Sequence, residues 1–184
     1  DNPTLDYEAE LAFVIGTGGR RIPAERALLH VAGYTVFNDG TLRDVQIRTG
    51  QWTLGKNVHG TGALGPDLVT PDELPTGAMG LRITTRVGEE LLQDGNTGAM
   101  IFDVARTIAL LSETLALEPG DVVAMGTPSG IGFARKPPRY LQPGEVCHVA
   151  IEQVGALHNP IVDDPAVERT APAPSTQPQR GGAA

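Results

Sequence analysis

Hydrophobic and polar positions along the chain predict many short strands and few helices. Residues 5–16 form a largely apolar run that stops at Gly16, which is typical of a strand that ends in a turn. Residues 31–37 and 121–125 predict two further strands. Residues 146–154 predict another, because apolar and polar side chains alternate moderately there until Gly155.

Two segments favour helices. Residues 23–29 begin with Pro23, which suits a first helical turn, and Gly33 follows as an exit. Residues 95–117 give the strongest helical signal, because apolar side chains recur there every three or four residues, at Ile101, Val104, Ile108, Leu111 and Leu115. With two or three helices among many strands, the pattern predicts a strand-dominated α+β fold.

Composition divides the chain into a domain and a tail. The 184 residues suffice for one domain with its own core, and 23 glycines and 15 prolines agree with many turns. We expect the folded domain to span residues 1–162. Residues 163–184 contain four prolines and no isoleucine, leucine or aromatic residue, so we expect a disordered tail there.

Charge and cysteine content exclude several classes of function. The net charge of −8 argues against non-specific binding to nucleic acid or to an anionic membrane. No apolar run approaches the ~20 residues that span a bilayer. The single cysteine, Cys147, excludes an internal disulfide framework and fits a reducing compartment, so we expect a cytoplasmic protein with Cys147 in its core.

An acidic pair lies in the first predicted strand. Side chains alternate along a strand, so Glu8 and Glu10 point to one face, with Asp6 beside them. Carboxylates held close together repel, and a hard divalent cation with oxygen ligands is the simplest partner for them. On spacing alone, a solvated edge strand with its acids facing water is the simpler alternative.

Other polar segments suggest a ligand site but do not specify it alone. If residues 39–46 turn helically, Asp39, Arg43 and Gln46 share one side; the alternative is a surface Asp–Arg pair that contributes little. Lys56, between a glycine and Asn57, would ordinarily be solvated. The glycine-rich turn at residues 126–132 can present backbone N–H groups and a hydroxyl to an anion, but it lacks the lysine of a phosphate-binding loop.

In chain order, these segments resemble the fumarylacetoacetate hydrolase family. The resemblance is carried by LDYEAELAFVIG from residue 5, AGYTVFNDGTLRDVQ from residue 32 and GKN from residue 55. It continues through QDGNT from residue 93, MIFDV from residue 100 and PGDVVAMGTPSGIG from residue 119. The likeness covers residues 5–162 and implies a mixed β-sandwich roll, commonly assembled as a homodimer.

The resemblance also implies roles for particular residues. The metal ligands would be Glu8, Glu10 and Asp39, and the ion is usually Mg²⁺ and sometimes Mn²⁺ or Ca²⁺. Catalytic roles fall on Lys56, Arg43 and Gln46. The substrate-binding residues would be Thr127, Arg43 and Lys56.

The implied function is that of a divalent-metal-dependent hydrolase. Such an enzyme cleaves a carbon–carbon bond in 2-oxo or 2,4-dioxo acids, in a reaction that develops enolate charge. A lyase or decarboxylase, a hydratase or an isomerase of the same family is an alternative, and so is a metal-binding fragment without a complete catalytic apparatus.

The sequence departs from the family at two places. Family members ordinarily carry an upstream segment whose His–Glu pair activates water, and no part of these 184 residues matches it, so we expect an N-terminally incomplete catalytic domain. His59 stands where the family often has aspartate, and we expect a solvated loop residue there. We expect His30 to be structural and His148 and His158 to be exposed.

Overall fold

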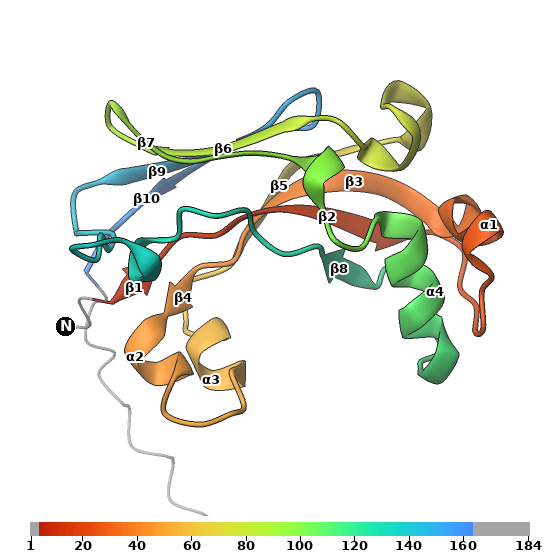
Figure 1. Cartoon of the computed structure of the whole chain (residues 1–184), viewed down its shortest axis with the longest axis horizontal. Coiled ribbons are helices and arrows are strands. Elements are labelled where there is room, and N and C mark those ends of the chain that lie inside the picture. Colours follow the sequence, from red (N-terminus) through yellow and green to blue (C-terminus); the bar gives the residue numbers. More distant parts are fainter. Residues whose placement is uncertain (1–3, 164–184) are drawn as a thin grey trace, which may run out of the picture.

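Two four-stranded antiparallel sheets and a short ribbon make up the fold (Figure 1). The computed structural model describes residues 4–163. One sheet has the order β10 (Gly155–Pro160), β9 (Val146–Ile151), β6 (Arg82–Val87), β7 (Glu90–Asn96). The other has the order β5 (Ala63–Val69), β3 (Val31–Asn38), β2 (Ala9–Ile15), β8 (Val122–Ala124). The ribbon pairs β1 (Leu5–Asp6) with β4 (Thr41–Leu42).

The helices are few and short, and they lie at the ends of the sheets. The α-helices are α1 (Ala24–Ala27), α2 (Arg43–Gln46), α3 (Thr53–Lys56) and α4 (Val104–Thr114). The 3₁₀ turns are η1 (Leu28–His30), η2 (Pro71–Glu73), η3 (Thr76–Ala78), η4 (Thr97–Ala99) and η5 (Gly132–Ala134). The predicted strand-dominated α+β class is therefore confirmed.

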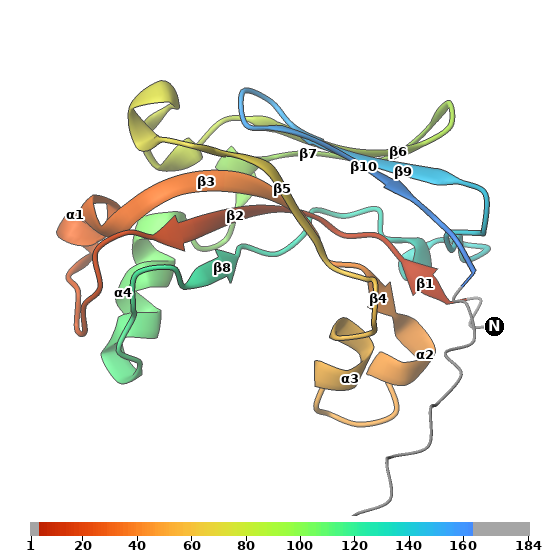
Figure 2. The same cartoon turned by 180° about the vertical axis from the view of Figure 1, so that it is seen from behind.

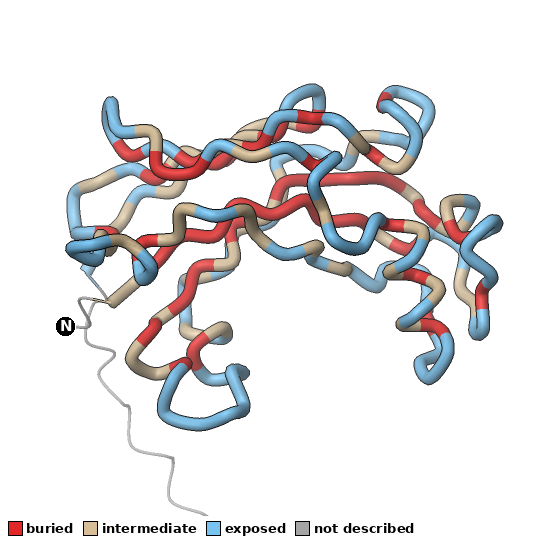
Figure 3. The backbone as a smooth tube through the Cα atoms, in the orientation of Figure 1, coloured by how far each residue is buried: buried red, intermediate tan, exposed pale blue. Residues whose placement is uncertain are grey.

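The core lies between the two large sheets. Strand β2 contacts both β6 and β9 across it, and Figure 3 shows buried residues along the strands that face one another. Leu11 and Phe13 of β2 and Val149 of β9 are almost fully inaccessible to solvent. Burying a side chain of this size contributes about 1.5–3 kcal/mol relative to leaving it exposed, so the facing sheets stabilise each other.

The first predicted strand, residues 5–16, is divided in two by the structure. Strand β1 ends at Asp6 because it pairs with β4, whereas β2 begins at Ala9 and pairs with β3. At the break, the Glu8 backbone N–H donates to the Asn38 side chain (3.2 Å). The Glu8 carbonyl accepts from the Asp39 backbone N–H (3.0 Å), so the break ties the acidic segment to the end of β3.

The predicted helix over residues 95–117 is wrong in its first third. Residues 95–96 complete β7 and a 3₁₀ turn follows, so α4 begins only after Asp103. The Asp103 side chain caps α4 by accepting a hydrogen bond from the Arg106 backbone N–H (2.8 Å). Ile101, which the periodicity placed on the apolar face, is 90% exposed. Glycines at 95 and 98 weaken helix formation in the first third, and an aspartate at the N-cap favours a start at residue 104.

The remaining predictions are confirmed to different extents. Residues 23–29 form α1 and part of η1, and residues 146–154 form β9 and the turn into β10. The predicted tail, residues 163–184, lies outside the described residues except for Asp163. Among the described helices, none is long and apolar enough to cross a bilayer.

Candidate active site and metal centre

Three carboxylates meet where β2 begins and β3 ends. Ala9 pairs with Asn38 across the ladder, so Glu8 and Glu10, on either side of Ala9, lie next to Asp39. One oxygen from each carboxylate lies within 4.8 Å of the others. Glu8 and Glu10 are buried and Asp39 is half-buried, so the alternative of a solvated edge strand is wrong.

Burial and the repulsion of neighbouring carboxylates disfavour the charged forms of Glu10 and Asp39. The pKa of Glu10 is raised to about 7, chiefly by burial and also by the Asp39 and Glu8 charges, whereas the hydrogen bond from the Gly126 backbone N–H opposes the rise. Burial also raises the pKa of Asp39, against the opposing effect of Lys56. The donor set consists of carboxylate oxygens alone, which suits a hard divalent cation such as Mg²⁺.

Two cationic side chains face the carboxylates. The Lys56 Nζ lies 3.0 Å from Glu8 Oε2 and 2.6 Å from Asp39 Oδ2. The Arg43 Nη2 lies 2.7 Å from Glu8 Oε1. The resemblance placed both residues at the active site, and the structure brings both to the acidic cluster.

Asp6 holds Arg43 in place and is not part of the cluster. The expectation that Asp6 lies beside Glu8 and Glu10 is wrong, because the break between β1 and β2 turns its side chain toward Arg43. The Arg43 Nε lies 2.8 Å from Asp6 Oδ2, and Asp6 is completely buried. The same carboxylate accepts hydrogen bonds from the backbone N–H groups of Tyr7, Gly132 and Phe133 at 2.8–2.9 Å.

Helices α2 and α3 carry the cationic residues and pack side by side (Figure 2). The predicted helical turn over residues 39–46 begins only at Arg43, because Thr41–Leu42 pairs with β1. The Arg43 Nη1 donates to Gln46 Oε1 (3.0 Å). A Cβ at Gly55 would lie 2.6 Å from the backbone N of Gln46, so the absence of a side chain permits this close approach.

The turn after β8 brings Gly126 against the carboxylate cluster, and Thr127 is the next residue along the chain. The Gly126 N–H donates to Glu10 Oε2 (2.8 Å), and the Thr127 hydroxyl accepts from Gln93 Nε2 (2.8 Å). Gln93, in β7, is 1% exposed, and sequence reasoning gave it no role. The available signal was a polar amide at an inward position of a strand, within a segment that carried the family resemblance.

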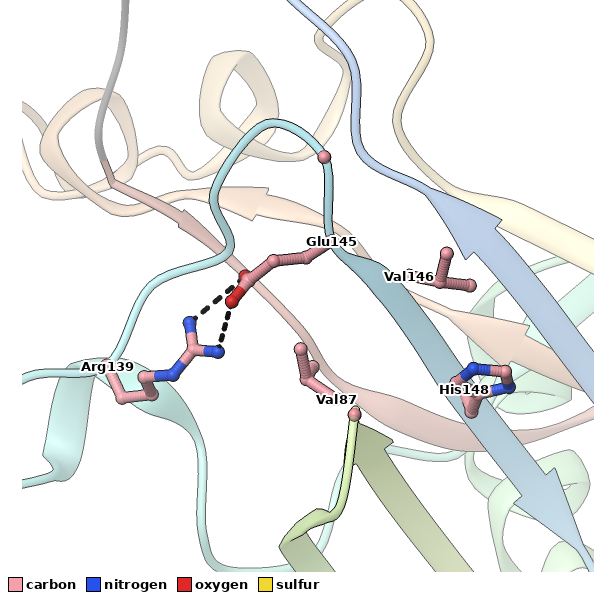
Figure 4. A pocket seen from close by; sticks show the side chains of 7 residues that line it. Val87, Arg139, Glu145, Val146 and His148 are labelled. Carbon is pink, nitrogen blue, oxygen red and sulfur yellow. Dashed lines mark hydrogen bonds and ion pairs between the residues drawn. The ribbon is translucent and has the colours of Figure 1, made fainter.

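One hollow adjoins Thr127, and another lies beside β6 and β9. One, of about 700 Å³, extends from Thr127 between α4 and β8, with Met100, Leu110 and Met125 among its apolar lining. The other, of about 340 Å³, contains Arg139 and Glu145, which pair with each other at 2.6 Å (Figure 4). Because Arg139 and Glu145 pair with each other, neither side chain presents an unpaired charge to a ligand in the second hollow.

The histidines and the cysteine lie outside the carboxylate cluster. His59 is exposed in the loop after α3, as expected. His148 and His158 form a cross-strand pair with Nδ1 atoms 2.5 Å apart; His158 is exposed but His148 is half-buried, contrary to expectation. Cys147 is buried, as expected, and burial raises the pKa of its thiol to about 12, so it is unsuited to act as a nucleophile.

Comparisons with known proteins agree with this geometry. The family described as fumarylacetoacetate (FAA) hydrolase C-terminal matches residues 2–162. A fumarylacetoacetate hydrolase structure from Exiguobacterium antarcticum is 44% identical, with a TM-score of 0.84 over 88% of this chain and 57% of that one.

Two further structures represent different reactions. A 5-carboxymethyl-2-hydroxymuconate delta-isomerase from Mycobacterium smegmatis is 33% identical, with a TM-score of 0.80 over 90% of this chain and 61% of that one. A fumarylpyruvate hydrolase from Pseudomonas aeruginosa, in complex with Mn²⁺ and pyruvate, is 34% identical, with a TM-score of 0.77 over 86% of this chain and 66% of that one.

The chain spans about half the length of the curated relatives that it matches. An uncharacterized protein of Staphylococcus saprophyticus is 46% identical over 159 residues, which is 86% of this chain and 52% of the relative. The family match covers nearly all of the described residues, and the resemblance stated on sequence segments is confirmed. The chain belongs to the fumarylacetoacetate hydrolase family.

Proposed function

We propose that this chain acts as a divalent-metal-dependent hydrolase that cleaves a carbon–carbon bond in 2-oxo or 2,4-dioxo acids. The observation that carries the proposal is the buried cluster of Glu8, Glu10 and Asp39 with Lys56 and Arg43 beside it. The solved fumarylpyruvate hydrolase with Mn²⁺ and pyruvate supports the substrate class.

The donor set fits a divalent cation. Glu8, Glu10 and Asp39 offer only oxygen atoms, and burial makes their uncompensated charge unfavourable, so these three residues would hold Mg²⁺, with Mn²⁺ or Ca²⁺ as alternatives. When bound, the ion supplies Lewis-acid polarisation of an oxo oxygen.

The chain's own polar groups bind and orient the acid. Lys56 and Arg43 present positive charge beside the cluster, which favours an anionic substrate and stabilises negative charge that develops during reaction. Gln46 fixes one end of the Arg43 guanidinium by accepting its hydrogen bond. Thr127 approaches from the β8 side, where its hydroxyl can meet a substrate carboxylate.

Product analysis separates the reaction types. A hydrolase consumes a 2,4-dioxo acid, with loss of its enol absorbance, and releases two shorter acids, whereas an isomerase leaves the carbon skeleton intact. We expect the hydrolytic products in the presence of Mg²⁺ and none with EDTA. Metal binding without turnover of any 2-oxo acid would favour the incomplete-fragment alternative. Light scattering tests the homodimer, which stays a prediction.

Metal should stabilise the protein through Glu10. Mg²⁺ or Mn²⁺ is expected to raise the melting temperature of the parent chain by mass action. In Glu10→Gln this rise should shrink or vanish, because one anionic ligand is lost. The metal-free variant should melt no lower than the metal-free parent, since one repulsive charge is gone and the amide oxygen still accepts from Gly126.

Thermal melts with EDTA and with excess metal measure both effects. Glu113→Gln, on the exposed face of α4, is the matched control and should retain the full metal response. An equal response in Glu10→Gln and the parent would exclude the site assignment, and with it the function built on that site.

Metal affinity should rise with pH up to about 7. In the folded protein the pKa of Glu10 is raised from its ordinary value of 4.5 to about 7. The protonated side chain therefore stabilises the metal-free fold: this contribution is complete below pH 4.5 and is lost as the pH rises through 7. A cation binds the ionised form and removes the proton. Titration calorimetry in buffers of different ionisation enthalpy should detect proton release at about pH 6 and little at about pH 8. Equal proton release at both would contradict this.

A further inference from the structure

The side-chain amide of Gln93 joins three segments around the candidate site. Strand β8 pairs only with Ala12 to Val14, so Ala9, between the two glutamates of the cluster, lies beyond the end of that partner strand. The Ala9 N–H donates instead to Gln93 Oε1 (3.0 Å). The other end of the amide reaches the turn after β8, where Nε2 donates to the Pro128 carbonyl (2.9 Å) and to the Thr127 hydroxyl (2.8 Å).

The orientation of this amide follows from its backbone partners. A backbone N–H can only donate and a carbonyl can only accept, so the oxygen of Gln93 must face Ala9 and the nitrogen must face Pro128. The Thr85 hydroxyl adds a second donor to the oxygen (2.7 Å). The nitrogen therefore has one remaining N–H, and this N–H points at Thr127 Oγ1.

This arrangement determines where the Thr127 proton can go. Since Thr127 Oγ1 accepts from Gln93, its own O–H must point elsewhere. Among residues 4–163, the Thr127 hydroxyl donates no hydrogen bond. Thr127 is half-buried and lines the 700 Å³ hollow beside Gly126, which binds Glu10.

We infer that Gln93 is a positioning residue that commits the Thr127 hydroxyl to act as a hydrogen-bond donor to a carboxylate of the bound acid. A hydroxyl otherwise rotates and can accept or donate. With its oxygen engaged by an N–H group, Thr127 selects an anionic oxygen over a donor group. The inference rests on the proposed function, because it concerns how a 2-oxo acid is held.

Reversing the polarity of residue 93 tests this role. The carboxylate introduced by Gln93→Glu cannot donate to Thr127, so the hydroxyl would turn its proton toward that carboxylate. We expect oxalate to bind the Mn²⁺-loaded variant about 10- to 100-fold more weakly, as measured by titration calorimetry, because a hydrogen bond to a charged group is lost. Thr127→Val should lose a similar factor, and Thr127→Ser, which keeps the hydroxyl, should bind within about threefold of the parent.

The double variant separates this role from repulsion of oxalate by the new charge. If Gln93 acts through Thr127, then adding Gln93→Glu to Thr127→Val should change the oxalate affinity less than about threefold. Direct repulsion would instead persist in the double variant. Thr85→Val, which removes a different hydrogen bond from the same amide, is the matched control and should bind oxalate within about twofold of the parent.

Each outcome bears on a distinct claim. Failure of the Mn²⁺-loaded parent to bind oxalate would overturn the proposed function and this inference together. Oxalate binding by the parent, with undiminished affinity in Gln93→Glu or an equal loss in the Thr127→Val background, would overturn only the role of Gln93. If Gln93→Glu does not fold, Gln93→Met provides the same comparison without a charge. Gln93→Met should weaken oxalate binding in the parent but not in the Thr127→Val background. An equal weakening in both backgrounds would overturn the inference.

Discussion

Replacing Asp6 by asparagine is expected to lower the free energy of unfolding by about 3–5 kcal/mol. Asp6 is completely buried, pairs with the Arg43 guanidinium at 2.8 Å and accepts three backbone N–H hydrogen bonds. Asparagine removes the charge and directs an NH₂ group at one or more of these donors. Among residues 4–163, the buried guanidinium would then keep Glu8 as its only ion-pair partner.

Urea denaturation of the metal-free chain measures this effect. Asp94→Asn is the matched control: Asp94 forms a two-point hydrogen bond with Arg82, but both side chains are about half exposed, so the midpoint should barely move. Asp6→Asn should also weaken activity, since Arg43 loses the carboxylate that orients it. A midpoint equal to that of Asp94→Asn would show that Asp6 does not anchor Arg43.

Replacing Lys56 by methionine is expected to lower kcat about 100- to 1000-fold, with a smaller change in KM. Methionine is similar in length but carries no charge. The Lys56 ammonium lies against both Glu8 and Asp39, so it is placed to stabilise negative charge that increases in the transition state more than in the bound substrate.

Steady-state kinetics on a 2,4-dioxo acid tests this expectation. The chain has one other lysine, Lys136, which is exposed in the loop after η5, and Lys136→Met should leave both constants unchanged. Thermal melts give a second readout: without the ammonium, Glu8 and Asp39 lose a counter-ion, so the rise in melting temperature with Mg²⁺ should be larger in Lys56→Met than in the parent. A change confined to KM would make Lys56 a simple carboxylate anchor.

Sequence patterns predicted the parts of the fold that are strongly apolar. Strands β2, β3 and β9 bury almost continuous or alternating apolar side chains, and these patterns were visible without tertiary information. The hairpin of β6 and β7 was missed, because its inward positions include the polar residues Thr85 and Gln93, which weaken the apolar alternation. The helical periodicity of residues 95–117 was overridden at its start by two glycines and a capping aspartate.

Part of the candidate site could be predicted from strand alternation, and the rest only from the family resemblance. Alternation alone placed Glu8 and Glu10 on one face, whereas Asp39 and Lys56 joined them only through the family resemblance. Local patterns could not identify Asp6 and Gln93 as supports, because their partners lie 37 and 34 residues away in sequence. Such partners depend on where β1 breaks and where β8 ends, which the register of the sheets decides.

The contact between Gly55 and Gln46 makes the cationic side of the site one mechanical element. Since no space separates the backbones of α2 and α3, a displacement of Lys56 also moves Arg43 and Gln46. A side chain at position 55 would therefore push the two helices apart and separate Lys56 from Arg43.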